Sequence, residues 1–275
     1  MTPSSSRADR PEPRPRWVFV GGLHRSGTSL LTRLISAHPA VSGIEGAPVP
    51  ENEGVFLQGA IPHTALSGIP GAFARDADQH LVEGSRHDTL ETALRLERDW
   101  APWFAPGAAW RIEKSPVNLL RTRLYQQLFP GAHFILITRH PGPSVAAVAK
   151  WSDEGPARLA EHWDIAHRLV LGDLPYLHAC LILRYEDLVA DTAGQLTAAL
   201  AFLGLSTDGI APPEAVRDGN ADYPAEGDAP VSEVAARFGY GPRSGPQVGL
   251  PKDLRCRHPL REVREAVAAV DVLRR

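Results

Sequence analysis

The segment from Trp17 to Leu31 constrains the fold of this chain more than any other stretch. It begins with five largely apolar residues, continues through a polar turn that contains Gly22 and Gly27, and then shows apolar residues at helical spacing from about Thr28. This order predicts a buried strand, a glycine-rich loop and the start of a helix. Backbone N–H groups at such a helix N-terminus point towards an anion, with the helix dipole behind them.

The loop has the glycine spacing of a phosphate-binding loop but lacks its lysine. Nucleotide triphosphatases carry Lys and then Ser or Thr directly after the second glycine, where the lysine binds phosphates and the hydroxyl binds magnesium. Here Gly27 is followed by Thr28 and Ser29, and the nearest cation is Arg25. The pattern therefore favours an anion that is bound by a fork-shaped cation and hydroxyls, in place of a lysine and a metal.

Composition limits the compartment and the partners. The chain has 275 residues, a formal net charge of −3 and two cysteines, Cys180 and Cys256. We therefore expect no nucleic-acid partner, since there is no overall basic field, and free thiols in place of a disulfide framework. No zinc-ligand spacing and no apolar run near 18 residues occur, so we expect a cytoplasmic protein without a metal or a membrane span.

The sequence predicts one domain that alternates strands and helices. Residues 1–16 are rich in proline and polar residues and indicate a disordered leader before a single domain at 17–275. The expected strands are 17–21, 40–44, 110–112, 133–138 and 178–184, and the expected helices are 28–37, 88–104, 117–129, 144–151, 156–174, 191–203 and 259–275, with a possible short helix at 73–80. This order indicates an α/β fold, a P-loop-like doubly wound parallel sheet flanked by helices. The irregular segments 45–87 and about 206–258 are expected to bind the acceptor or act as a lid.

The polar residues at the strand ends favour sulfuryl transfer over phosphoryl transfer. Ligands of such sheets lie beyond the carboxyl ends of the strands, where Arg25, Lys114, Arg139 and Tyr185 fall. Phosphoryl transfer on a P-loop requires magnesium, usually held by an Asp that ends an apolar strand, whereas the strand at 134–138 ends in Arg139. A sulfuryl group carries less negative charge than a terminal phosphoryl group. Arg, Lys and hydroxyl donors alone can therefore in principle stabilise its transfer.

Four motifs in order then carry a family resemblance. They are Gly-Leu-His-Arg-Ser-Gly-Thr-Ser at 22–29, Glu-Lys-Ser-Pro at 113–116, Phe-Ile-Leu-Ile-Thr-Arg-His-Pro at 134–141 and Leu-Arg-Tyr-Glu-Asp-Leu at 183–188. With these motifs the chain resembles, over about residues 17–205, the sulfotransferases that use 3′-phosphoadenosine 5′-phosphosulfate (PAPS), and it is most similar to their protein-tyrosine and bacterial small-molecule branch. The resemblance implies transfer of a sulfuryl group from PAPS to a hydroxyl or amine of a small-molecule or glycan acceptor, without a metal, and release of adenosine 3′,5′-bisphosphate.

The resemblance also implies roles for single residues. The residues that it assigns to the 5′-phosphosulfate are Arg25, Ser26, Gly27, Thr28 and Ser29. Lys114 would neutralise charge on the bridging oxygen, Arg139 would bind the 3′-phosphate, and Tyr185 would contact the adenine side of the donor.

Two parts of the expected 3′-phosphate site depart from the family pattern. The family usually carries a serine eight residues after the arginine, where this chain has Ala147, and Ser144 is the candidate in its place. In the C-terminal segment, Arg243 in the run Arg-Ser-Gly and Lys252 are candidates for the part that closes over the 3′-phosphate.

The general base has several candidates. A carboxylate or histidine must accept the acceptor's proton. Glu45 follows the second strand, where the tyrosine-modifying relatives carry their acidic base, and it completes the expected catalytic set with Lys114 and Arg25. Glu51, Glu53 and His63 lie in the same segment and stay open as alternatives.

Two other functions stay open at this point. One is an ATP-dependent kinase with a degenerate P-loop, which magnesium dependence would reveal. The other is a non-catalytic nucleotide-binding protein of the same fold. The sequence indicates no oligomeric state.

Overall fold

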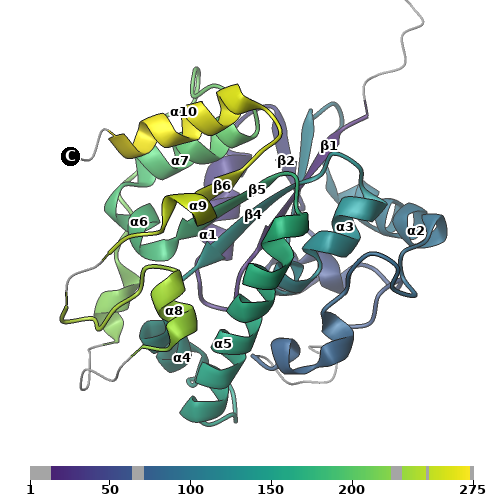
Figure 1. The fold of residues 1–275 in the computed structure, drawn as a ribbon. Coiled ribbons are helices and arrows are strands. Elements are labelled where there is room, and N and C mark those ends of the chain that lie inside the picture. Colours follow the sequence, from purple (N-terminus) through teal and green to yellow (C-terminus); the bar gives the residue numbers. More distant parts are fainter. Residues whose placement is uncertain (1–13, 64–70, 224–230, 246–247, 273–275) are drawn as a thin grey trace, which may run out of the picture.

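The protein folds around one six-stranded sheet with helices on both faces (Figure 1). The computed structural model describes residues 14–63, 71–223, 231–245 and 248–272. Its strands are β1 Arg16–Gly21, β2 Val41–Gly43, β3 Trp110–Lys114, β4 His133–Thr138, β5 Cys180–Arg184 and β6 Cys256–Arg257. Their order in the sheet is β2-β3-β1-β4-β5-β6, and all neighbours are parallel except β5 and β6. The predicted α/β class is confirmed, while the short antiparallel strand β6 was not predicted.

The helices cover two apolar clusters, one on each face of the sheet. They are α1 Thr28–Ser36, α2 Leu90–Trp100, α3 Thr122–Leu128, α4 Pro141–Val148, α5 Pro156–Asp173, α6 Tyr185–Ala190, α7 Thr192–Phe202, α8 Glu233–Arg237, α9 Lys252–Arg255 and α10 Arg261–Val272. Successive strand side chains point to opposite faces, so Phe19 joins one cluster and Val20 the other. Helices α2, α3 and α5 pack on the first cluster, and α1, α7 and α10 on the second (Figure 1).

Proline explains two differences between the predicted and observed helices. The helix expected at 144–151 begins earlier, at Pro141, because the first turn of a helix has no internal partner for the N–H that proline lacks. The helix expected at 88–104 ends at Trp100 and continues as the short 3₁₀ turn Ala101–Trp103, which contains Pro102.

The helix expected at 117–129 is divided in two. A 3₁₀ turn, Pro116–Leu120, is followed by Arg121, whose φ of −117° and ψ of 8° are not helical, and α3 begins at Thr122. The fully buried Arg121 side chain donates to Pro62 O and Gln79 Oε1, both at 3.0 Å. A tertiary contact therefore fixes the break. The short helix considered at 73–80 is likewise two 3₁₀ turns, Phe73–Arg75 and Ala77–Gln79.

Most of the expected leader, residues 1–13, lies outside the described residues, and β1 begins at Arg16. The two expected irregular segments are partly outside as well, at 64–70, 224–230 and 246–247. No helix in the described ranges is long and apolar enough to cross a membrane.

Candidate active site

The loop after β1 packs directly against β4 and α6. Arg25 and Gly27 adopt left-handed backbone conformations, with φ of 67° and 101°. A β-carbon at Gly22 would lie 2.4 Å from the carbonyl oxygen of Ile137, and one at Gly27 would lie 2.9 Å from Cδ2 of Tyr185. The two glycines thus let the loop approach its neighbours more closely than any side chain would permit.

Buried polar groups without partners face this part of the molecule. The Ser26 hydroxyl and Nη2 of Arg139 are buried and have no hydrogen-bond partner among the described residues. A buried donor left unpaired costs free energy comparable to a lost hydrogen bond, and an anion would supply the missing acceptors. The residues present therefore fit an anionic ligand at the loop.

Lys114 reaches the loop region from the neighbouring strand. Strand β3 pairs with β1 in parallel, and Lys114 is in register with Val20, close to the end of β1. Its side chain is buried, and Nζ donates to Glu53 Oε1 and to the carbonyl oxygen of Glu51, both at 3.0 Å. The structure thus places a buried cation of the second strand against Glu51 and Glu53, and its role at the donor stays a prediction.

An open cleft of about 690 Å³ runs from the start of α1 to Lys114. Ser29, Glu45 and Glu51 line it together with Lys114, so the structure brings these predicted residues to one cavity. The Ser29 hydroxyl donates to Glu51 Oε2 at 3.1 Å. This cleft has room for a small organic acceptor beside the loop.

Glu53 is the carboxylate in direct contact with Lys114. It is 7% exposed, and burial raises its pKa to about 7, a shift that nearby Lys114 opposes and that the neighbouring Glu113 and Glu51 carboxylates reinforce. A carboxylate with a pKa near neutrality, beside a cation, has the properties of a general base.

The other candidate bases have different surroundings. Glu45 is exposed and lines the cleft, and its backbone N–H donates to the carbonyl oxygen of Trp103 at 3.3 Å. His63 is buried with Nδ1 3.3 Å from Gln79 Oε1, and burial, with a smaller contribution from Arg121, lowers its pKa to about 4. The roles of Glu45 and Glu53 as the base both stay predictions, and Glu53 is the one of the two that contacts Lys114.

The second predicted group of donor-binding residues gathers at the end of β4. Arg139 donates from Nη1 to the carbonyl oxygen of Arg25 at 2.8 Å and from Nε to Asn220 Oδ1 at 2.7 Å. Its guanidinium lies 4.5 Å from the centroid of the Tyr185 ring, and the Tyr185 hydroxyl accepts from Gly219 N at 2.8 Å. Arg25, Arg139 and Tyr185 therefore form one connected cluster.

The predicted Arg243 contacts Asn220 and Tyr223, which the sequence analysis did not identify, and Tyr223 in turn contacts Arg139 and Lys150. Arg243 donates to the carbonyl oxygens of Tyr223 and, at 3.1 Å, of Asn220. The Tyr223 ring lies 5.6 Å from the Arg139 guanidinium and 4.3 Å from Lys150 Nζ. Asn220, Tyr223 and Lys150 stand in segments without a recognisable motif, so no local signal marked them.

The remaining residues predicted to bind the donor are Ser144, Thr28 and Lys252. The buried Ser144 hydroxyl donates to the carbonyl oxygen of Arg139 at 3.4 Å, and Ala147, where the family carries serine, is also buried. Thr28, the first residue of α1, is buried, while Lys252, the first residue of α9, is exposed. Their roles at the donor stay predictions.

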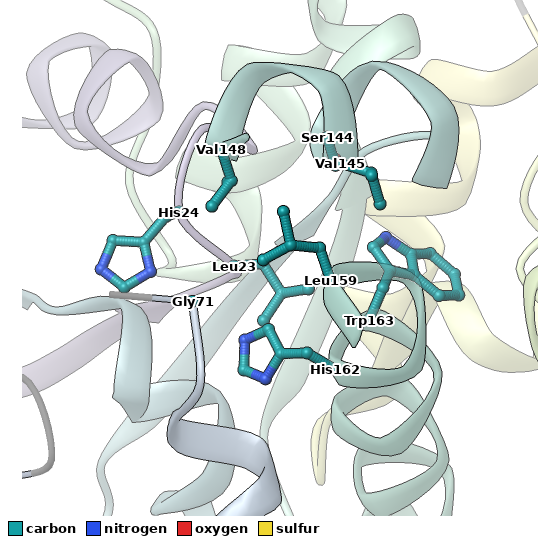
Figure 2. A pocket seen from close by; sticks show the side chains of 9 residues that line it. All are labelled: Leu23, His24, Gly71, Ser144, Val145, Val148, Leu159, His162 and Trp163. Carbon is teal, nitrogen blue, oxygen red and sulfur yellow. The ribbon is translucent and has the colours of Figure 1, made fainter. Parts of the chain in front are cut away.

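A small cavity lies beside the loop, between α4 and α5 (Figure 2). Leu23, His24, Val148 and His162 are among its lining residues, and its volume of about 20 Å³ has room for roughly one water molecule. Nδ1 of His24 and Nε2 of His162 are buried without a partner in the described part of the chain. The cavity is too small for an organic molecule.

A model described as the sulfotransferase family matches residues 15–209, well over half of the chain. The chain belongs to the sulfotransferase family. This sulfotransferase is 24% identical over 199 residues to protein-tyrosine sulfotransferase 2 of Gallus gallus. The match covers 69% of this chain and 51% of that relative. The chain therefore spans about half the length of the curated relative that it matches.

Solved structures support the fold. The sulfotransferase is similar to sulfotransferase STF1 of Mycobacterium tuberculosis H37Rv, at 17% identity and a TM-score of 0.50, over 72% of this chain and 70% of that one. It is also similar to sulfotransferase STF9 of Mycobacterium avium, at 15% identity and a TM-score of 0.50, over 80% and 71%. Within the described ranges, no group of three or more His, Cys, Asp or Glu side chains could hold a metal ion.

Proposed function

We propose that this sulfotransferase moves a sulfuryl group from PAPS to a hydroxyl or amine of a small-molecule or glycan acceptor. The observation that carries the proposal is the contact of Glu53 with Lys114, a residue that lines the cleft beside the lysine-free loop. It supplies a cation and a base with a pKa near 7 at the place where a sulfuryl donor would be held.

The donor-binding residues divide into two groups. Arg25 and Ser26 would hold the phosphosulfate end, and the buried Ser26 hydroxyl has no partner within the described ranges. Arg139, whose Nη2 likewise has no partner there, would hold the 3′-phosphate, and Tyr185 would flank the adenosine. When bound, the donor supplies the sulfuryl group and leaves as adenosine 3′,5′-bisphosphate.

Two residues of this chain then act on the acceptor's proton and on the negative charge of the leaving oxygen. As the acceptor oxygen forms its bond to sulfur and the bond from sulfur to the bridging oxygen breaks, the acceptor's proton passes to the Glu53 carboxylate. Lys114 Nζ donates to the bridging oxygen, which gains negative charge as it leaves. Such a preorganised donor typically lowers the barrier by about 3 to 4 kcal/mol.

Calorimetry with adenosine 3′,5′-bisphosphate, and separately with ATP and magnesium, tests the donor. We expect the bisphosphate to bind and magnesium to have no effect on its affinity. Tighter binding of ATP would favour a kinase with a degenerate loop. Binding of the bisphosphate without turnover in any acceptor pool, screened with labelled PAPS and mass spectrometry, would favour a non-catalytic binding protein.

A further inference from the structure

The turn that carries Glu53 is fixed by the residue next to Lys114. Glu53 is followed by Gly54, and Glu113 precedes Lys114 in β3. The N–H of Gly54 donates to Glu113 Oε1 at 2.9 Å. One hydrogen bond therefore connects the neighbour of the candidate base to the neighbour of the candidate cation.

The Glu113 carboxylate also accepts hydrogen bonds from two side chains. Glu113 is fully buried, and the two donors are Ser115 Oγ at 2.6 Å and Asn118 Nδ2 at 2.5 Å. The Ser115 hydroxyl in turn accepts from the N–H of Val55 at 3.0 Å. Both backbone N–H groups that follow Glu53 are thus bound by the segment around Lys114.

The packing around Gly54 leaves no space for a side chain. A β-carbon there would lie 2.7 Å from both Cγ and Oε1 of Glu113 and 2.9 Å from Nε1 of Trp100. Nε1 of Trp100 donates to the carbonyl oxygen of Gly54 at 2.8 Å. On the other side of Glu53, Glu51 and Asn52 have left-handed φ values of 53° and 52°. Side chains in this region cost free energy, so the surrounding contacts must hold the turn in place.

We propose that Glu113 is a positioning residue that anchors the turn at Gly54 and thereby sets the Glu53 carboxylate against Lys114. The inference rests on the proposed function for its catalytic meaning. The distance that Glu113 would maintain is the 3.0 Å between Glu53 Oε1 and Lys114 Nζ. Because a displacement of about 1 Å can cost roughly a hundredfold in rate, an anchor of this kind would matter for turnover more than for donor binding.

The protonation of Glu53 reports the geometry directly. The charged groups that act on it are Lys114, which lowers its pKa, and Glu113 and Glu51, which raise it. If the turn moves away from Lys114, the Glu53 pKa should shift, because both the burial that raises it and the cation that lowers it depend on where the turn lies. A purely structural role of Glu113 would lower the stability of the protein without this shift.

The test is a titration of Glu53 in the full chain by carbon NMR of labelled glutamate, assigned with Glu53→Gln. Gly54→Ala displaces the turn and keeps the Glu113 side chain, so we expect the titration midpoint of Glu53 to shift. Glu113→Ala removes the anchor and should shift the midpoint as well. Glu113→Gln keeps an acceptor oxygen for Gly54 N–H, so its midpoint should stay closer to that of the unsubstituted protein than the midpoint of Glu113→Ala does. Glu91→Gln, the same chemical change at an exposed position of α2, is the matched control.

Kinetics complete the test. We expect Gly54→Ala to lower kcat by roughly a hundredfold while the bisphosphate affinity stays within a few fold, and Glu113→Gln to retain most of kcat. An unchanged Glu53 midpoint in a folded Gly54→Ala protein would overturn the positioning role. The titration needs no donor. A shifted midpoint in a protein that does not bind the bisphosphate would therefore overturn the proposed function alone.

Discussion

Gly27 lies against the ring of Tyr185, so that a β-carbon on Gly27 would stand 2.9 Å from Tyr185 Cδ2. The contact joins the loop after β1 to the first residue of α6, two elements far apart in the sequence. The two proposed ends of the donor site, phosphosulfate and adenosine, therefore share one packed surface.

Gly27→Ala tests this surface. The substitution places a side chain at a φ of 101° and against Tyr185, so we expect bisphosphate affinity to fall by at least about tenfold and the protein to lose about 1 to 3 kcal/mol of stability. Calorimetry and chemical denaturation measure the two effects. Gly204→Ala is the control, because Gly204 also has a positive φ, 69°, but has open space around its Cα. Equal bisphosphate affinity in both variants would contradict the expectation.

Lys114→Ala should separate catalysis from binding. Since Nζ is proposed to stabilise the leaving oxygen, we expect kcat to fall by roughly a hundredfold or more, with the bisphosphate affinity within a few fold of the unsubstituted protein. Steady-state kinetics with labelled PAPS and calorimetry give the two numbers. A variant that only weakens bisphosphate binding would show that Lys114 holds the donor and does not act on the leaving group.

The pH dependence of turnover should report Glu53. Burial raises its pKa to about 7, so the carboxylate is largely protonated below that pH and largely ionised above it. A base must be ionised to accept a proton, and we therefore expect kcat/KM to rise about tenfold per pH unit below pH 7 and to level off above it. In Glu53→Gln the rate should be low and the slope should vanish. If the slope persists, Glu45 or another group is the base.

Buried histidines should make the fold sensitive to acid. Burial lowers the pKa of His24, His133 and His167 to about 4 and that of His162 to about 3. In the unfolded chain these groups titrate near 6.5, so below that pH the unfolded state binds more protons, and stability present above pH 6.5 is lost as the pH falls towards 4. Each such histidine should cost about 2 kcal/mol at pH 5.

Denaturation in urea at pH 7 and pH 5 measures this loss. The best single variant is His133→Phe, because His133 packs between Trp110 and Phe202 at ring distances of 4.8 and 5.1 Å. A phenylalanine there does not titrate, so the variant should lose less stability between the two pH values than the unsubstituted protein. An equal loss would mean that His133 does not contribute.

Local patterns were sufficient for most of the fold. Apolar runs such as His133–Thr138, which was predicted at its observed bounds, carry their own signal because a central strand is buried on both faces. Strand β6 is two residues long and pairs with β5 only through its place at the edge of the sheet, so nothing in its sequence marks it. The break at Arg121 escaped prediction for the same reason, since its cause lies at Pro62 and Gln79.

The candidate site divides in the same way. Arg25, Lys114, Arg139 and Tyr185 lie at or near the carboxyl ends of parallel strands, which the topology alone brings together. The choice among Glu45, Glu51, Glu53 and His63 depended on the path of an irregular segment. The pairing of Glu53 with Lys114 joins residues 61 positions apart, and no helical or strand periodicity encodes such a contact.

Arg139 connects segments from early and late in the chain, since its partners Arg25 and Asn220 lie 114 and 81 positions away in sequence. Contacts of such long range form slowly, because the intervening loops must close before the contacts offset the lost entropy. Strands β1 and β4 pair over nearly the same separation in sequence, with Val18 in register with His133, and this pairing brings Arg25 and Arg139 together. During refolding, the ability to bind the bisphosphate should therefore not return before the strand signal in circular dichroism.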